Sequence, residues 1–265
     1  MFIPEIQWVF VVSGLAVGFI VGMTGVGGGS LMTPILLFFG IQPSTAVGTD
    51  LLYAAVTKSG GIFVHHKKKT IDWRITKLLA YGSLPAAAFT LITLQGFDLH
   101  SESTNDFIKA MLGYTIIATA IAIILKDKML ELSHRRDWIF TRMTLDQREK
   151  VTVIVGAVMG VLVTLTSIGA GVLGTVTLFL LYPMLPVATL VGTEIAHAVP
   201  LTLLAGLGHA GVGNVDWPLL FNLLLGSLPG IYVGSHLPTA IPEKVLRVTL
   251  SIVMILIEPF NKVPT

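Results

Sequence analysis

The chain has 265 residues, of which 53% are hydrophobic and 12% are charged, and its mean hydropathy is +0.82. Soluble domains carry about 25% charged residues, so this composition disfavours a disordered chain, a nucleic-acid binder and an ordinary soluble enzyme. The net charge of +2 implies no polyanionic partner, and the lack of cysteine excludes disulfides and thiolate metal sites. The composition therefore predicts an all-α, polytopic membrane protein whose partner is the lipid bilayer.

Long apolar stretches of roughly the 20 residues that a bilayer requires recur along the chain. We predict membrane spans near 6–24, 43–64, 75–97, 107–125, 151–168, 186–210, 217–237 and 244–261. Two shorter apolar pieces, 31–40 and 172–182, are long enough for about half a bilayer. The first stretch follows no basic start and no small-residue cleavage site, so we expect a span and not a cleaved signal peptide.

Lysine and arginine indicate how the spans are oriented, because cytoplasmic loops carry an excess of these residues. The loop 65–74 and the linker 126–150 are basic and are predicted to be cytoplasmic. The loops 98–106 and 211–217 contain no lysine or arginine and are predicted to lie outside. This alternation places both termini outside.

The two halves of the chain repeat each other. The matched motifs, in chain order, are Gly14-x-x-x-Gly18 with Gly156-x-x-x-Gly160, Thr24-Gly-Val-Gly-Gly-Gly29 with Thr166-Ser-Ile-Gly-Ala-Gly171, Val47-Gly-Thr-Asp50 with Val191-Gly-Thr-Glu194, His65 with His209, Asp72-Trp73 with Asp216-Trp217, and Gly82-Ser-Leu-Pro85 with Gly226-Ser-Leu-Pro229. Because the cytoplasmic loop 65–74 matches the outside loop 211–217, the repeats are predicted to have inverted topology, a plan that recurs in secondary transporters.

The repeat divides the chain into three predicted parts. These are a first transmembrane repeat over 1–126, a cytoplasmic linker over 127–149 and a second, inverted repeat over 150–265. Inversion requires each half to cross the membrane an odd number of times. Either each short apolar piece crosses, which gives five spans per half, or residues 6–40 form a re-entrant hairpin that is followed by three crossings.

Each half also contains a glycine-rich interruption in an apolar region. Each glycine costs a helix about 1 kcal/mol relative to alanine, so the runs Gly25–Ser30 and Ser167–Gly171 predict unwound backbone. Such backbone is tolerated in a membrane only where protein or a water-filled cavity covers it. The amide groups of the short helix after each run would favour an anion. The alternative is close helix packing through small residues.

Ionisable residues inside spans are costly and are candidates for function. Here they are Asp50, Lys58, Glu194 and His197, which we interpret as coupling or charge-carrying groups. Asp50 and Glu194 follow the same Val-Gly-Thr, so a pseudo-axis could bring them close enough to share a proton. Alternatively the two carboxylates cap helices, and Lys58 either pairs with Asp50 or extends to the cytoplasmic surface. No resident metal or cofactor is expected.

These motifs together, with Leu237-Pro-x-x-Ile-Pro-Glu-Lys-Val-Leu-Arg247, resemble the TauE/SafE family of sulfite exporters. The resemblance implies a permease of the bacterial cytoplasmic (inner) membrane that exports sulfite, an organosulfonate or another small anion. It also implies which residues line the substrate path: Gly25, Gly27, Gly28, Gly29, Ser30, Ser167, Gly169, Ala170 and Gly171, with Thr49 and Thr193 beside them. The family usually has a small residue, often serine, where this chain has Asp50 and Glu194.

The sequence thus predicts a secondary transporter for a small anion that works by alternating access, with a proton or substrate gradient as the driving force, since no ATP-binding motif exists. One alternative is a cation or metal transporter that uses Asp50, Glu194 and His197 as ligands. A second is an intramembrane enzyme, although no cysteine exists and no serine–histidine pair is evident from the sequence. Assembly as a homodimer is left open.

Overall fold

The computed structural model describes residues 6–24, 31–96, 102–133 and 143–236, and their regular secondary structure is entirely helical. The helices are α1 (Trp8–Thr24), α2 (Met32–Phe38), α3 (Pro43–Lys67), α4 (Trp73–Gln95), α5 (Glu102–Ser133), α6 (Leu145–Thr166), α7 (Val172–Leu181), α8 (Val187–Gly211) and α9 (Trp217–His236). The predicted all-α fold class is confirmed. The glycine run 25–30 and the predicted span 244–261 lie outside the described residues.

Four of the described helices, α4, α6, α8 and α9, are long and apolar enough to cross a membrane, and α1 and α7 are shorter apolar helices. Their outer surfaces carry large apolar side chains, such as Tyr81 and Phe89 on α4 and Ile154 on α6, which are all more than half exposed. Contiguous apolar surface of this kind suits contact with lipid. The helix α3 is as long as α8 but carries Asp50 and Lys58, both buried inside the protein.

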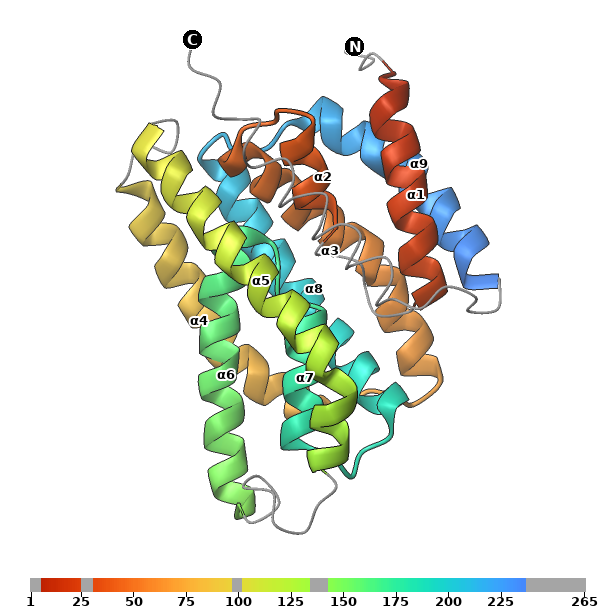
Figure 1. Ribbon diagram of the computed structural model, residues 1–265, viewed down its shortest axis with the longest axis vertical. Coiled ribbons are helices and arrows are strands. Elements are labelled where there is room, and N and C mark those ends of the chain that lie inside the picture. Colours follow the sequence, from red (N-terminus) through yellow and green to blue (C-terminus); the bar gives the residue numbers. More distant parts are fainter. Residues whose placement is uncertain (1–5, 25–30, 97–101, 134–142, 237–265) are drawn as a thin grey trace.

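The helices form two outer pairs around a central pair. Figure 1 shows α1 beside α9 and α4 beside α6, with α3 and α8 crossing between these pairs. Glycine allows the outer helices to touch through their backbones. A Cβ atom on Gly14 would lie 2.2 Å from the carbonyl oxygen of Leu223, and one on Gly156 would lie 2.3 Å from that of Leu79. The Gly-x-x-x-Gly motifs therefore serve close helix packing.

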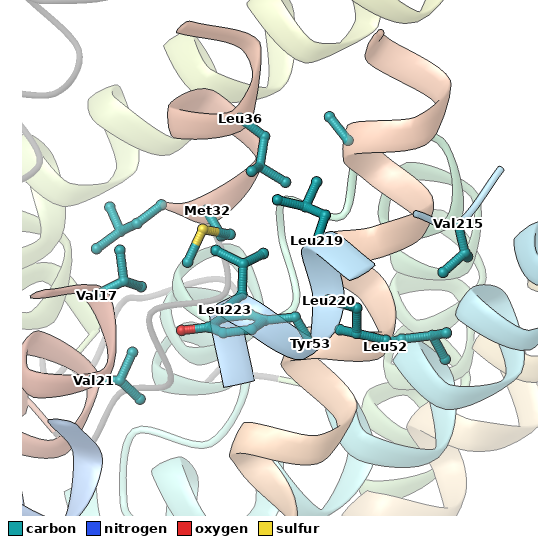
Figure 2. Close-up of a cluster of buried hydrophobic side chains, with 12 residues drawn as sticks. Val17, Val21, Met32, Leu36, Leu52, Tyr53, Val215, Leu219, Leu220 and Leu223 are labelled. Atoms are coloured by element: carbon teal, nitrogen blue, oxygen red, sulfur yellow. The ribbon is translucent and has the colours of Figure 1, made fainter. Parts of the chain in front are cut away.

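The two largest of the apolar clusters in the described part of the chain lie at the centre of the protein. Figure 2 shows the first, in which α1, α2, α3 and α9 contribute Val17, Val21, Met32, Leu36, Leu52, Tyr53, Leu219 and Leu223. The second lies between α3, α4, α5 and α8, and it includes Val47, Leu51, Ala87, Ile108, Leu112, Ala198, Leu201 and Ala205. Ile168 and Ala170, from the second glycine-rich run, belong to this second cluster. The interrupted backbone is thus covered by protein, as the apolar environment requires.

The helices on either side of the predicted linker reach further into it than expected. The helix α5 continues to Ser133, and α6 begins at Leu145 instead of near 151. A capping box explains the earlier start, because Thr144 accepts the N–H of Gln147 at 3.3 Å while the Gln147 side chain accepts that of Thr144 at 3.0 Å. The first turn of α6 is thereby stabilised although it is polar and exposed.

Candidate functional site

The second glycine-rich run interrupts the helical path between α6 and α7. Ser167 adopts a left-handed conformation with φ of 56°, and Gly169 has φ of 119°. The Thr166 hydroxyl accepts the N–H of Ile168 at 3.2 Å, which satisfies a donor that the helix has released. We refer to residues 167–171 as the second break.

The amide groups at the start of α7 are less available than the sequence suggested. The Gly169 carbonyl accepts the N–H of Gly171 at 2.8 Å and the N–H of Gly174 at 3.1 Å. Two donors that an anion was expected to use are therefore already bonded within the chain. A side chain is a further source of positive charge at the second break.

Asp50 lies two turns inside α3 and is fully buried. Its Oδ2 accepts the backbone N–H of Thr33 at 3.1 Å and the Thr33 hydroxyl at 2.5 Å. Its carboxylate also interacts with the Ser167 side chain in the second break and, electrostatically, with Lys58. Asp50 therefore does not cap its own helix, as one interpretation held, but satisfies a donor in the first turn of α2.

Lys58 lies two turns after Asp50 on the same helix, and its side chain is 4% exposed. The Nζ donates a hydrogen bond to the carbonyl oxygen of Ala170. The side chain thus points into the protein and does not extend to the cytoplasmic surface. One helix of the first half places a carboxylate near Ser167 and a hydrogen-bonded ammonium group on Ala170, both within the second break.

Glu194 and His197 occupy the corresponding region of α8 and are both buried. Glu194 lies against α7, since a Cβ atom on Gly174 would be 3.0 Å from Glu194 Cγ. His197 Nε2 is 2.8 Å from the Ser83 hydroxyl on α4. The sequence did not reveal this serine–histidine pair, because the two residues are 114 positions apart. At the matching place in the other half, Tyr53 interacts with the side chain of Ser227.

Thr49 and Thr193 connect the two halves by matched hydrogen bonds. Thr193 accepts the backbone N–H of Asp72 at 2.9 Å, and Thr49 accepts that of Asp216 at 3.1 Å. Each aspartate also caps the helix that follows it, since its carboxylate accepts a first-turn N–H of α4 or α9. The Val-Gly-Thr and Asp-Trp motifs therefore meet across the halves.

The set Asp50, Glu194 and His197, which the cation alternative requires as ligands, does not form a metal cluster. Within the described part of the chain, no three histidine, aspartate or glutamate side chains come together as a metal site. Asp50 accepts its hydrogen bonds from Thr33 on α2, whereas His197 faces Ser83 on α4.

Comparison with known proteins identifies relatives over almost the whole chain. The family model described as "Sulfite exporter TauE/SafE" matches residues 10–258. The probable membrane transporter protein YjnA of Bacillus subtilis is 40% identical over 246 residues, which cover 92% of this chain and 96% of the relative. The probable membrane transporter protein YdhB of the same organism is 27% identical, with coverage of 87% and 89%.

A probable membrane transporter protein of Methanocaldococcus jannaschii is 28% identical and covers 91% of each chain. No solved structure matches. The family match extends through both glycine-rich runs and the paired motifs that meet in the structure. The chain belongs to the TauE/SafE sulfite exporter family of membrane transporters.

Proposed function

We propose that this transporter exports a small anion, sulfite or an organosulfonate, across the cytoplasmic membrane of a bacterium, and that both of its termini lie outside. The family description supports the substrate class, since it names sulfite. The basic loop 65–74 and the loop 211–217, which contains no lysine or arginine, support the orientation. The relatives are named as membrane transporters, which supports transport and not catalysis as the activity.

The observation that carries the proposal is the pair of buried charges at the second break. Lys58 bonds the carbonyl of Ala170, and the Asp50 carboxylate lies near Ser167, beside an apolar cluster of the interior. Charged groups at membrane depth are costly and are retained where they serve a pathway. A helix interruption of this kind, at matched positions of two halves, is where secondary transporters bind their substrates.

The matched contacts between the halves support alternating access as the mechanism. Thr49 and Thr193 each bond the backbone of the opposite half, and each outer helix pair is built by glycines at matched positions. Two halves related by inverted topology could adopt two conformations of similar energy, each open to one side. We propose that the halves rock about the central pair α3 and α8.

We further propose that Asp50 and Glu194 couple transport to protons. A carboxylate beside an anion repels it when ionised, so protonation of at least one group would accompany anion binding. His197, one helical turn after Glu194, contacts Ser83 and could relay a proton. Coupling of this kind links anion movement to the proton gradient.

The proposal is tested with the purified chain in proteoliposomes. Liposomes preloaded with unlabelled sulfite should accumulate radiolabelled sulfite by exchange, and an excess of methanesulfonate should compete. Liposomes without protein, and the same assay with labelled divalent cations, serve as controls. Exchange of a cation without exchange of any anion would contradict the proposal and favour the cation alternative.

A further inference from the structure

In the described part of the chain, the buried ammonium group of Lys58 has fewer hydrogen-bond acceptors around it than it has N–H donors. An ammonium group carries three donors and a full positive charge. Among the described residues, the hydrogen bond of Lys58 is made to one neutral acceptor, the Ala170 carbonyl, and no carboxylate forms an ion pair with it. A charge in an apolar interior is costly unless a counter-charge is close.

The groups that act electrostatically on Lys58 do not supply this counter-charge at contact distance. They are Asp50, on the same helix, and His197, on α8. The Oδ2 of Asp50 accepts both donors of Thr33, its Oδ1 accepts no hydrogen bond from the described residues, and His197 faces the Ser83 hydroxyl. The ammonium group therefore lies at the second break with an unmet need for an anionic partner.

The matching position in the other half shows that packing alone does not require a cation here. This residue is Thr202 on α8, and it is buried. Its hydroxyl donates to carbonyls of its own helix, those of Ala198 at 2.9 Å and Val199 at 3.3 Å. The Lys58 side chain instead extends from the first half to the second break, so this buried positive charge is found at position 58 and not at the matched position 202.

We infer that Lys58 is the cationic contact of the transported anion, and that its Nζ exchanges the Ala170 carbonyl for an anion oxygen when substrate enters. This inference deepens the proposed function and rests on it. A charge-assisted hydrogen bond to an oxyanion is stronger than one to a neutral carbonyl, so the exchange is favourable. It also releases the second break from α3, which connects substrate binding to movement of α7 relative to the first half.

The experiment is a calorimetric titration of the purified full chain with methanesulfonate and with dimethyl sulfone, a neutral molecule of similar shape. The wild type should bind the anion and not the sulfone. Lys58→Gln should weaken methanesulfonate binding about 10- to 100-fold, because hydrogen bonds to charged groups contribute more than neutral ones. Lys58→Arg should retain most of the affinity. Lys150→Gln, at an exposed lysine paired with Asp146, is the matched control and should bind like the wild type.

A labelling experiment on the wild type tests the same inference without a variant. The anionic aldehyde 4-formylbenzenesulfonate forms an imine with a lysine Nζ, with loss of water, and cyanoborohydride reduces this imine to a stable amine. Peptide mapping should find a label on Lys58 that excess methanesulfonate prevents. Tight methanesulfonate binding by folded Lys58→Gln, or no protected label on Lys58, would overturn the inference. If the wild type binds no anion at all, the proposed function itself fails.

Discussion

The helices α3 and α8 hold equivalent places in the two halves, and they share their packing and one buried carboxylate, but only α3 carries a buried lysine. Gly48 on α3 lies against the backbone of Asn214, and Gly192 on α8 lies against that of Thr70, each so close that a Cβ would be 2.1 Å from a carbonyl oxygen. Yet α3 carries Lys58 where α8 carries Thr202. The duplicated backbone contacts maintain the same packing in both halves, while the side chains at the matched positions 58 and 202 differ in charge.

The largest expected effect comes from filling the space at the shared contacts. A Cβ on Gly82 or Gly226 would lie 1.9 Å from the carbonyl oxygen of Val153 or Val11. The backbones of an outer helix pair would have to separate, so we expect Gly82→Ala and Gly226→Ala each to abolish accumulation of folded protein. Size-exclusion chromatography of a fluorescent fusion measures this.

Gly113→Ala on α5 is the control, because a Cβ there meets nothing within 4 Å. It should accumulate like the wild type. Normal folding of one of the two contact variants, with failure of the other, would show that the halves do not share this packing.

The second prediction concerns the carboxylates at matched positions of α3 and α8. The double variant Asp50→Asn and Glu194→Gln mimics protonated side chains, so anion binding should survive and lose its dependence on pH. Uphill transport driven by a proton gradient should fail, because no proton is then taken up or released. Transport into proteoliposomes with an imposed pH gradient measures this. A double variant that still concentrates sulfite against its gradient would refute the coupling scheme.

A smaller loss of stability, equal in the two halves, is expected when the hydrogen bonds that Thr49 and Thr193 accept from the opposite half are removed. Thr49→Val and Thr193→Val each remove one acceptor for a backbone N–H of the opposite half, at a cost of about 1 kcal/mol. Thermal denaturation in detergent should show similar decreases in the two midpoints. Thr93→Val, whose hydroxyl bonds only its own helix at Phe89, should change the midpoint less. Unequal decreases in the midpoints of Thr49→Val and Thr193→Val would mean that the two hydrogen bonds contribute differently to stability.

The sequence predicted the helical class, the helix order and the interruption at 167–171 because these depend on local composition. Apolar length, glycine density and the duplicated motifs can all be read along the chain. The start of α6 was predicted too late, since the apolar pattern begins near 151 while the Thr144–Gln147 capping box starts the helix earlier.

The contacts of the candidate site were less predictable, because they join residues far apart in the chain. Nothing local indicates that Lys58 meets the carbonyl of Ala170 or that Ser83 meets His197. The Gly169 carbonyl accepts the amides of Gly171 and Gly174 at the start of α7, and Gly169 itself adopts a positive φ, which local composition does not specify. The duplication was the one available signal, since it marks Ser83 and Ser227 as equivalent before their partners are known.

The most direct test of the central claim, that the two halves are inverted, uses the loops that follow α3 and α8. Lys69 and Gly213 are matched, exposed residues in these loops, and both have positive φ. Lys69 carries a side chain in this conformation, and a Cβ on Gly213 would meet no atom within 4 Å. The chain contains no cysteine, so Lys69→Cys and Gly213→Cys each introduce a single thiol. In intact cells a membrane-impermeant maleimide should label the thiol at 213, and label that at 69 only after permeabilisation. Labelling of both thiols from the same face would contradict the inverted repeat.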